Sequence, residues 1–273
     1  MIIRSSLLLG GIIGLFAFCQ KPETSIGYEF ETTPVWADEF EERGLPDSNK
    51  WGYEVGGNGW GNNELQFYTD KRSENARVEG GKLIIEARKE DFQEKNYTSA
   101  RLTTKGKADW TYGRFVIRAK LPKGRGTWPA IWMLASQQLY GSAYWPDNGE
   151  IDIMEHVGYD PGVVHATVHT KAFNHIAGTQ RGDTLTITDA MTNFHDYVLE
   201  WTPDYIRAFV DTTQYFEFRN TQKGWQEWPY DKPEYLLLNI AVGGNWGGQK
   251  GVDDTIFPQR MEIEYVRVYR LKE

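Results

Sequence analysis

GEIDIMEH, at residues 149–156, reads as a buried β-strand that three carboxylates interrupt. Glu and Asp are almost never fully buried unless they are paired or used, so these acids need an explanation. Because side chains alternate along a strand, Glu150 and Asp152 point to one face, and a regular strand would turn Glu155 to the other. A β-bulge, one extra residue near Met154, would return Glu155 to the face of Glu150. The segment therefore predicts a bulged strand with three carboxylates on one face.

Two glutamates in this arrangement suit the cleavage of a glycosidic bond. Their Cα atoms would lie about 13 Å apart at roughly 3.3 Å per residue. Side chains that lean together across a curved sheet would close this gap to the ~5–5.5 Å of a retaining glycosidase. Glu150 would then be the nucleophile and Glu155 the general acid and base, while Asp152 assists by hydrogen-bonding Glu150 and by keeping the three groups in unequal protonation states. This chemistry needs no metal or other cofactor.

Four further segments accompany this one, and together they resemble glycoside hydrolase family 16. They are residues 61–69 (GNNELQFYT), 126–134 (GTWPAIWML), 166–170 (ATVHT) and 239–246 (NIAVGGNW). The resemblance covers roughly residues 35–270 and is specifically to bacterial laminarinase-like endo-β-1,3-glucanases, whose signature is E-I-D-x-x-E. Members with the shorter spacing E-x-D-x-E are typically lichenases. The resemblance implies a retaining endo-glycosidase that hydrolyses β-1,3-glucosidic bonds in laminarin-type β-glucans, with β-glucan polysaccharides and oligosaccharides as its partners.

Short alternating segments with Gly, Pro and Asp turns run through the rest of the chain, and helical signals are scarce. Residues 114–121 alternate in polarity, residues 78–85 contain a Gly-Gly hairpin, and residues 261–269 read as a final strand. The lack of a repeat of roughly forty residues favours a sandwich over a propeller. We therefore predict an all-β fold, and the resemblance specifies a β-jelly-roll sandwich of two curved antiparallel sheets with a concave substrate cleft.

Aromatic residues are abundant, with 11 Trp, 15 Tyr and 13 Phe. Pyranose rings stack their C–H faces on aromatic rings and present hydrogen-bonding edges, so a glucan groove combines Trp with polar side chains. The resemblance places Trp128 and Trp132 beside the catalytic strand, and it implies that His169 hydrogen-bonds the substrate or the acid/base. Three further sugar contacts suggested by the resemblance are Asn62, Arg101 and Trp246. Core, turn or surface roles are the alternatives for these residues.

A structural calcium ion on the convex side is common in the family, and the matching positions here are Glu39, Gly81 and Glu264. Family members often carry Asp at the last of these positions, so Glu264 changes the reach and the coordination of that ligand. The resemblance thus leaves two alternatives. Either a calcium ion supports folding at this place, or no ion binds.

The composition limits the possible partners. A chain of 273 residues with 40% hydrophobic residues can bury one large core, and all-β domains of this length are normal. The net charge of −8 argues against nucleic acid and against an anionic polymer as the partner, whereas a neutral glucan is compatible with it. We expect one catalytic domain, residues 28–273, and a monomer.

The N-terminus has the pattern of an export signal. Arg4 precedes an apolar run, residues 7–18, which is too short to span a bilayer as a helix but fits the core of a signal peptide. Cys19, the only cysteine, follows this run directly and precedes polar residues, which resembles a bacterial lipoprotein site where the thiol is acylated. With no second cysteine, the folded domain has no internal disulfide.

We therefore predict a lipoprotein-type signal peptide at residues 1–18 and a polar tether at residues 19–27. The protein would be exported to the bacterial cell envelope and lipid-anchored at the outer membrane or in the periplasm. Phe18 departs from the small residue that usually precedes a lipidated cysteine. Ordinary secretion is the alternative.

Two other functions stay open. A non-catalytic glucan-binding lipoprotein would keep the groove without turnover, which the presence of all three carboxylates disfavours. A sister enzyme would act on mixed-linkage β-1,3-1,4-glucan, agarose or carrageenan, or would transfer the glycosyl unit to a sugar. Loops at the cleft rims would set this specificity, and we expect these rims at residues 135–147 and 173–189. Glu64 and Glu200 lack a partner carboxylate at the required spacing, so we expect structural pairing for both.

Overall fold

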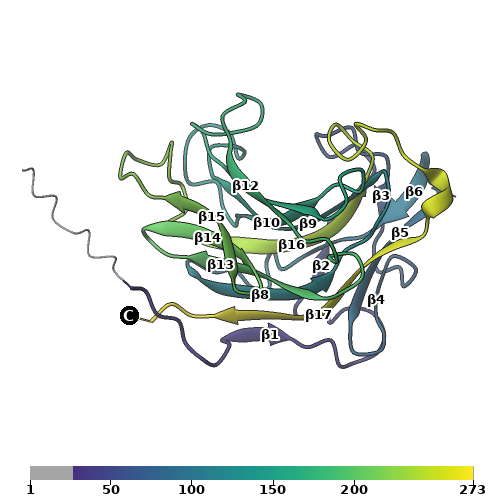
Figure 1. Cartoon of the computed structure of the whole chain (residues 1–273), viewed down its shortest axis with the longest axis horizontal. Coiled ribbons are helices and arrows are strands. Elements are labelled where there is room, and N and C mark those ends of the chain that lie inside the picture. The colour runs from purple at the N-terminus through teal and green to yellow at the C-terminus, as the bar shows by residue number, and fades with distance from the viewer. Residues whose placement is uncertain (1–26, 273) are drawn as a thin grey trace, which may run out of the picture.

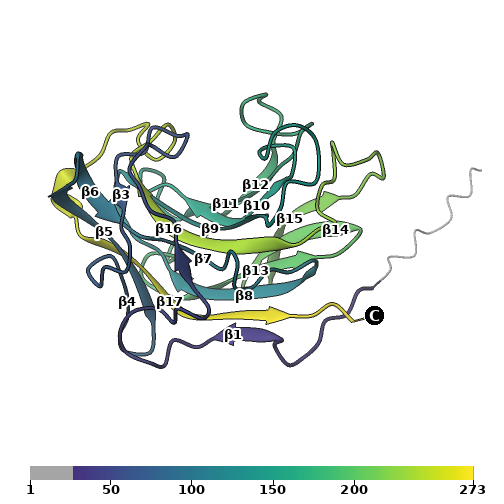
Figure 2. The same cartoon turned by 180° about the vertical axis from the view of Figure 1, so that it is seen from behind.

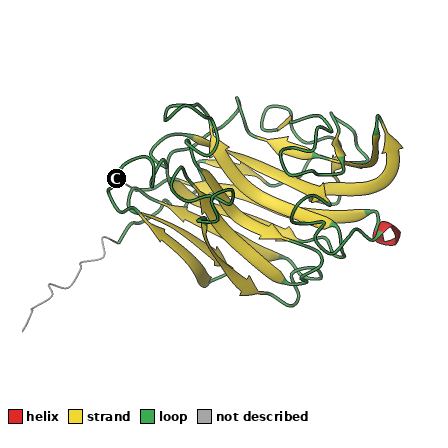
Figure 3. Ribbon diagram, turned by 90° about the horizontal axis from the view of Figure 1, so that it is seen from above, coloured by secondary structure: helices red, strands yellow, loops and turns green. Residues whose placement is uncertain are grey.

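The computed structural model describes residues 27–272, which fold into two β-sheets packed face to face (Figure 1). The predicted signal peptide, Cys19 and most of the predicted tether lie outside these residues, so their boundaries stay predictions. Figure 3 shows that the described chain is almost entirely strand and loop, apart from the short 3₁₀ helix η1 (Asp254–Ile256). Within residues 27–272, no helix has the length and apolar character needed to cross a membrane.

The seven-stranded sheet has the order β12-β11-β10-β9-β16-β7-β2, and all its neighbouring strands are antiparallel. Its strands are β2 (Gly52–Tyr53), β7 (Arg101–Thr103), β9 (Thr127–Ala135), β10 (Glu150–His156), β11 (Val163–His169), β12 (Arg181–Thr186) and β16 (Glu234–Val242). In Figures 1 and 2 its strands β9, β10 and β16 lie above β8, β17 and β1 of the other sheet, and loops rise on both sides. The curved sheet and the raised loops frame its outer face.

The ten-stranded sheet follows the order β15-β14-β13-β8-β17-β5-β6-β3, with β1 paired to β17 and β4 paired to β5. Its strands are β1 (Trp36–Asp38), β3 (Phe67–Tyr68), β4 (Ala76–Val78), β5 (Leu83–Phe92), β6 (Lys95–Ser99), β8 (Gly113–Lys120), β13 (His195–Trp201), β14 (Tyr205–Val210), β15 (Thr213–Arg219) and β17 (Gln259–Tyr269). The pair β3–β6 is parallel, which departs locally from the antiparallel sheets that we predicted. The predicted sandwich of two antiparallel sheets is otherwise confirmed.

Local sequence patterns explain several of these strands. β8 shows the predicted alternation, since Phe115 and Ile117 are fully buried in the core whereas Arg118 is partly exposed. Gly80 and Gly81 both have positive φ, 61° and 72°, in the predicted tight turn between β4 and β5. The predicted final strand is β17, which pairs with both β5 and β8.

β16 is buried along its whole length, which explains its nearly continuous apolar sequence. Leu236 and Leu238 belong to the main core between the two sheets. Tyr235 and Leu237 point to the opposite face, where they pack with Leu134 in a second, smaller cluster. The strand therefore contributes to the core on one face and to the framed outer surface on the other.

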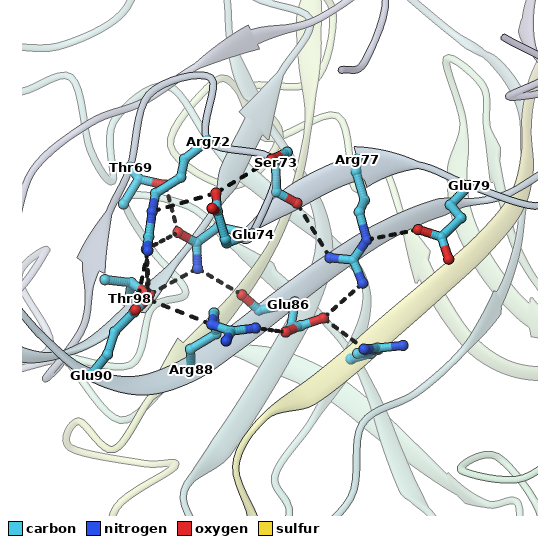
Figure 4. A network of polar contacts seen from close by, with 12 residues as sticks. Thr69, Arg72, Ser73, Glu74, Arg77, Glu79, Glu86, Arg88, Glu90 and Thr98 are labelled. Atoms are coloured by element: carbon cyan, nitrogen blue, oxygen red, sulfur yellow. Dashed lines mark hydrogen bonds and ion pairs between the residues drawn. The ribbon is translucent and has the colours of Figure 1, made fainter. Parts of the chain in front are cut away.

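A network of ion pairs ties together strands β4, β5 and β17 of the ten-stranded sheet (Figure 4). Glu86 of β5 is buried, and its carboxylate contacts Arg77 of β4 at 2.9 Å and Arg260 of β17 at 2.7 Å. Arg88 contacts the other carboxylate oxygen of Glu86. The network thus links three strands through one buried acid, on the side of the molecule away from the framed surface.

Candidate active site

β10 carries the predicted bulge. Against its neighbour β9, Asp152 pairs with Trp132 and Met154 pairs with Ile131, so Ile153 is an extra residue without a partner on β9. The register against β11 shifts at the same place. Ile153 and Met154 are both fully buried in the core, and the alternation of side chains resumes one residue late. The prediction of a bulged strand is confirmed.

The bulge brings Glu155 to the same face as Glu150 and Asp152. All three line a cavity of about 400 Å³ on the outer face of the seven-stranded sheet. A second cavity of about 590 Å³ adjoins the first and shares Glu150 and Glu155 with it. The two cavities form one groove, and the two glutamates lie where they meet. A polymer in this groove would extend past the glutamates in both directions.

Burial dominates the electrostatics of the three acids. It raises the pKa of Glu150 to about 8, with a further contribution from the charge of Asp152. It also raises the pKa of Glu155 to about 7, and that of Asp152 well above its ordinary value. The charge of His169 opposes this shift at both glutamates. The group therefore holds protons near neutral pH, as an acid catalyst requires.

Specific contacts distinguish the two glutamates. Trp128 Nε1 donates a hydrogen bond to Glu155 Oε1 at 3.0 Å. His169 Nε2 lies 3.8 Å from Glu150 Oε1 and 3.3 Å from Asp152 Oδ2, and the carboxyl groups of Glu150 and Asp152 share a hydrogen bond. Burial and the charge of Asp152 together leave Glu150 with the higher pKa of the two glutamates, although the charge of His169 lowers it. A proton on His169 would favour the ionised form of Glu150, which a nucleophile requires.

One half of the groove is built around Arg101. Its guanidinium lies between the rings of Trp60 and Trp132, 4.6 Å from each ring centroid, and its Nε is 2.7 Å from Glu54 Oε2. Trp132 Nε1 in turn donates a hydrogen bond of 2.7 Å to Asn239 Oδ1. The stacking and the ion pair hold both tryptophans in defined orientations.

The other half of the groove is built around Trp246. Its ring meets that of Trp128 edge to face at 5.5 Å and that of His165 at 4.9 Å. Asn62 borders both halves, and its Nδ2 donates a hydrogen bond of 3.3 Å to Glu64 Oε1. The structure therefore places all six predicted sugar-contact residues along the groove. That they contact sugar stays a prediction.

Sequence reasoning missed several residues of the groove. Trp60 and Asn239 line it; Trp60 directly precedes one segment that carries the family resemblance, and Asn239 begins another. Trp145 and His175 also line it, and both lie within the predicted rims. Tyr230 carried no signal in the sequence, yet its single hydroxyl proton lies between the backbone carbonyls of His169, at 2.8 Å, and Glu150, at 3.1 Å, and so joins β10 to β11.

The predicted rims both border the groove, with one difference. Residues 135–147 contribute Tyr144 and Trp145 as expected. Residues 173–189 are not all loop, because they include β12, the edge strand of the seven-stranded sheet. β12 pairs with β11, and only the part of this segment before β12 overhangs the groove. This part contributes His175, Ile176 and Gln180.

The two acids for which we expected structural pairing differ in position. Glu200 lies on the ten-stranded sheet, 3.5 Å from Arg114, as expected. Glu64 accepts hydrogen bonds from Gln66 at 2.6 Å and from Tyr68 at 3.2 Å, so it too is structurally paired. Unlike Glu200, however, Glu64 also borders the groove.

In this structure the residues of the predicted calcium site do not present free oxygen ligands to a common point, because their carboxylates pair with arginines. Glu39 makes a two-pronged ion pair with Arg267, with both distances at 2.8 Å. Glu264 is 2.8 Å from Arg118 Nε, and Gly81 lies in the β4–β5 turn. Calcium takes six to eight oxygen ligands, and here each carboxylate is already neutralised by an arginine. The site stays a sequence prediction, and no step of the chemistry depends on it.

Two partly buried glutamates on one face of a bulged strand, in a groove lined with tryptophan, define a site for the hydrolysis of polysaccharides. Comparisons with known proteins identify the family. Residues 60–267 match the glycosyl hydrolases family 16. The chain is 63% identical over 279 residues to a beta-glucanase of Rhodothermus marinus, which covers 100% of this chain and 96% of that protein.

A second relative is a glucan endo-1,3-beta-glucosidase of Cryptopygus antarcticus, 40% identical over 252 residues that cover 85% of this chain and 90% of that one. The X-ray structure of the laminarinase from Rhodothermus marinus matches with a TM-score of 0.88 at 60% identity, over 90% of this chain and 99% of the other. The chain therefore belongs to glycoside hydrolase family 16, and its sandwich is the predicted β-jelly roll.

Proposed function

We propose that this protein is a retaining endo-glycosidase that hydrolyses β-1,3-glucosidic bonds in laminarin-type β-glucans. The observation that carries the proposal is the bulge in β10, which puts Glu150 and Glu155 together at the middle of a continuous groove. The relatives described as a beta-glucanase, a glucan endo-1,3-beta-glucosidase and a laminarinase support the choice of substrate. A groove that continues on both sides of the glutamates suits cleavage within a chain rather than at its end.

The reaction proceeds in two displacements. In the first, the carboxylate of Glu150 attacks the anomeric carbon while Glu155 transfers its proton to the departing glycosidic oxygen, so that a glycosyl ester forms and a shortened glucan with a free 3-hydroxyl leaves. In the second, the carboxylate of Glu155 takes a proton from water, the water oxygen attacks the anomeric carbon, and the ester bond to Glu150 breaks. Two inversions restore the β configuration, and no cofactor takes part.

The neighbours of the two glutamates support these roles. The raised pKa of Glu155 keeps it protonated for the first displacement, and its bond from Trp128 fixes the direction of the carboxyl. Asp152 shares a hydrogen bond with Glu150, and His169 stands close to both. A protonated Asp152 that donates this hydrogen bond would stabilise negative charge on the nucleophile when the ester breaks, and the charge of His169 would act in the same direction.

Aromatic side chains on both sides of the glutamates would bind the glucan. Trp132 and Arg101 offer a ring face and hydrogen-bond donors in one half, and Trp246 offers a ring in the other. Asn62, next to both halves, is placed to hydrogen-bond a sugar near the cleaved bond. Together these side chains would hold several sugars in register with the catalytic pair.

A product time course on laminarin tests the proposal. Chromatography should show a series of oligosaccharides at early times, as expected for internal cleavage, and NMR should show the β-anomer as the first product. An initial α-anomer would contradict the double displacement. Release of glucose alone from the start would contradict the endo mode.

Mixed-linkage β-1,3-1,4-glucan is the second candidate substrate, because the name of the 63% identical relative, beta-glucanase, does not restrict the linkage. Initial rates on laminarin, lichenan and agarose, measured side by side, separate the candidates. We expect the highest kcat/KM on laminarin. Cleavage of laminarin by the wild-type protein, lost in a Glu150→Gln variant that still binds laminarin, would exclude a purely binding function.

We further propose that the protein is exported to the cell envelope and anchored through acylated Cys19, and that it acts as a monomer. The apolar run followed by a solitary cysteine supports the anchor. Incorporation of labelled palmitate in a bacterial host, and its loss in Cys19→Ser, tests acylation. Light scattering of the protein without its first 26 residues tests the monomer. Labelling that persists in Cys19→Ser would contradict the anchor.

A further inference from the structure

The groove contains a group of side chains that the hydrolytic reaction does not fully explain. Glu150, Asp152 and His169 each present one ligand atom, and these three atoms lie within 4.8 Å of one another. A neutral imidazole nitrogen with two carboxylate oxygens is a donor set that borderline divalent metals such as Zn²⁺ accept. The three residues come from adjacent strands, β10 and β11, so the sheet itself holds them together.

The distances between the donor atoms match a tetrahedral ion. Zn²⁺ binds nitrogen and carboxylate oxygen at about 2.0–2.2 Å, which makes the edge of a regular tetrahedron about 3.3–3.6 Å. His169 Nε2 lies 3.3 Å from Asp152 Oδ2 and 3.8 Å from Glu150 Oε1. Small side-chain adjustments would place all three atoms on one ion, and the fourth position would face the groove.

A second observation points to a ligand at this place. Asp152 is 3% exposed, and its Oδ2 has no hydrogen-bond partner among residues 27–272 although it faces His169 Nε2. A buried carboxylate oxygen without a donor is costly unless something else satisfies it. Within the same range, no Lys or Arg forms an ion pair with Glu150, Asp152 or Glu155. A bound cation would therefore displace the protons that these carboxyl groups hold and supply the positive partner that Lys and Arg do not.

We propose that Glu150, Asp152 and His169 form a binding site for a divalent transition-metal ion of the Zn²⁺ class. The bound ion occupies the carboxylate of the nucleophile, so it competes with the glucan and inhibits the enzyme reversibly. His169 Nδ1 has no hydrogen-bond partner in the described part of the chain, and histidine ligands of tight sites usually have one. We therefore expect affinity in the micromolar range, weaker than that of a structural zinc site.

Cobalt spectroscopy tests the site without relying on activity. The protein lacking its first 26 residues is stripped with a chelator, desalted and titrated with Co²⁺, whose tetrahedral complexes absorb visible light far more strongly than octahedral ones. We expect one equivalent of Co²⁺ to give the tetrahedral spectrum and Zn²⁺ to abolish it. His169→Ala should weaken binding at least tenfold, and Asp152→Asn should do the same if the first variant does not fold.

A matched control is His195→Gln. His195 also lies between two carboxylates, 3.0 Å from Asp189 and 2.9 Å from Asp211, but on the other sheet and near the surface. This variant should bind Co²⁺ like the wild type. An octahedral spectrum, a spectrum unchanged in both His169→Ala and Asp152→Asn, or one lost only in His195→Gln would overturn the proposal.

Kinetics then connect the site to the reaction. Zn²⁺ should raise the apparent KM for laminarin without changing kcat, and EDTA should restore the rate. Noncompetitive inhibition by Zn²⁺, or none at concentrations that saturate the cobalt site, would overturn the competitive role. The spectroscopic result does not depend on which glucan the enzyme cleaves, so a failure of the metal site is distinguishable from a failure of the proposed substrate.

Discussion

At the scale of single residues, three carboxyl groups lie close together in one groove, which is unfavourable for their ionised forms. Glu150, Asp152 and Glu155 share one groove, and the basic side chain paired with two of them in the described chain is His169. Three ionised carboxylates at such a place repel one another and lose hydration. The folded protein therefore retains protons there at a pH where exposed carboxyls have lost them. The proton donor that the reaction needs is obtained at the expense of folding stability.

Replacing the nucleophile by its neutral isostere should stabilise the protein in a pH-dependent way. The pKa of Glu150 is raised from 4.5 to about 8, so the folded state binds this proton more tightly than the unfolded state does. The folded state therefore loses stability as the pH rises from about 4.5 through about 8. Glu150→Gln does not undergo this loss. Thermal melts should show a higher Tm for the variant at about pH 8 and equal values at about pH 4. A difference that is the same at both pH values would contradict this account.

Removing either catalytic carboxylate should nearly abolish turnover, and azide should reveal which role was lost. General acid–base catalysis accelerates reactions by about 10²–10⁴-fold, so Glu155→Ala should lower kcat on laminarin by at least that factor. With azide, Glu150→Ala should yield an α-glycosyl azide, because azide attacks directly from the side of the missing nucleophile. Glu155→Ala should yield a β-glycosyl azide, because azide then attacks the ester on Glu150. NMR of the products distinguishes these anomers, and exchanged outcomes would reverse the assignment of roles.

At the scale of elements, the bulge in β10 decides where the acids point. Ile153 is the surplus residue, and the register against β9 is regular on both sides of it. A strand without this residue would still pair Asp152 with Trp132 and Glu155 with Ala130. Alternation in such a strand also places all three acids on one face. The shorter spacing in lichenase-like members of the family is thus a second solution to the same geometric problem.

Deletion of Ile153 should therefore be tolerated better than an insertion at the same place. The shortened strand keeps its acids in the groove, at the cost of one buried side chain and a Tm lowered by the resulting cavity. We expect its kcat on laminarin to exceed that of Glu155→Ala at least tenfold. An extra glycine after Ile153 should turn Glu155 toward the core and remove activity. Equal activity in the two length variants would contradict the register argument.

In the ten-stranded sheet, the ion pairs of Glu86 join β4, β5 and β17 (Figure 4). Its side chain is 1% exposed, so its loss leaves three arginines without their shared partner. Glu86→Gln should lower the free energy of unfolding by about 3 kcal/mol. Glu79, which pairs with Arg77 at 3.3 Å but is about half exposed, provides the control.

Glu79→Gln should cost less than about 1 kcal/mol, because exposed ion pairs contribute little. Urea denaturation of both variants gives the comparison. The specific activity of folded Glu86→Gln at low temperature should match that of the wild type, since the network lies away from the groove. A loss of activity without a loss of stability would contradict a purely structural role for Glu86.

At the scale of the whole molecule, the sandwich assembles the groove from distant parts of the chain. Trp60 precedes β3, Arg101 begins β7, Trp132 lies in β9 and Trp246 follows β16. In the proposed mechanism the carboxyl groups perform the chemistry, and the remainder of the fold holds these side chains around them. Metal ions enter this picture only through the predicted calcium site and the proposed inhibitory site.

Chelation should therefore leave catalysis intact. At a temperature well below the Tm, EDTA should not lower the initial rate on laminarin, because the two displacements use only carboxyl groups and water. The predicted calcium site at Glu39 and Glu264 is tested separately from catalysis, by measuring the melting temperature with EDTA and with added calcium. A rise in Tm with calcium would mean that Arg267 and Arg118 give way to an ion. A fall in the initial rate with EDTA would contradict the metal-free mechanism.

The strand pattern and the catalytic motif could be read from the chain because both depend on local rules. Side chains alternate with a period of two, so β8 and the spacing of Glu150, Asp152 and Glu155 carry their own geometry, including the need for a bulge. The Gly-Gly turn is local in the same sense, since positive φ at two successive residues favours glycine.

The surroundings of each side chain could not be read in this way, because they depend on which strands become neighbours. Arg101 stacks between two tryptophans from other segments, Tyr230 joins β10 to β11, and Glu39 meets Arg267 from the far end of the chain. Sheet order and register bring these partners together, and no sequence spacing encodes them. For the same reason, the contact of His169 with Glu150 and Asp152 depends on the pairing of β11 with β10, which the tertiary structure decides.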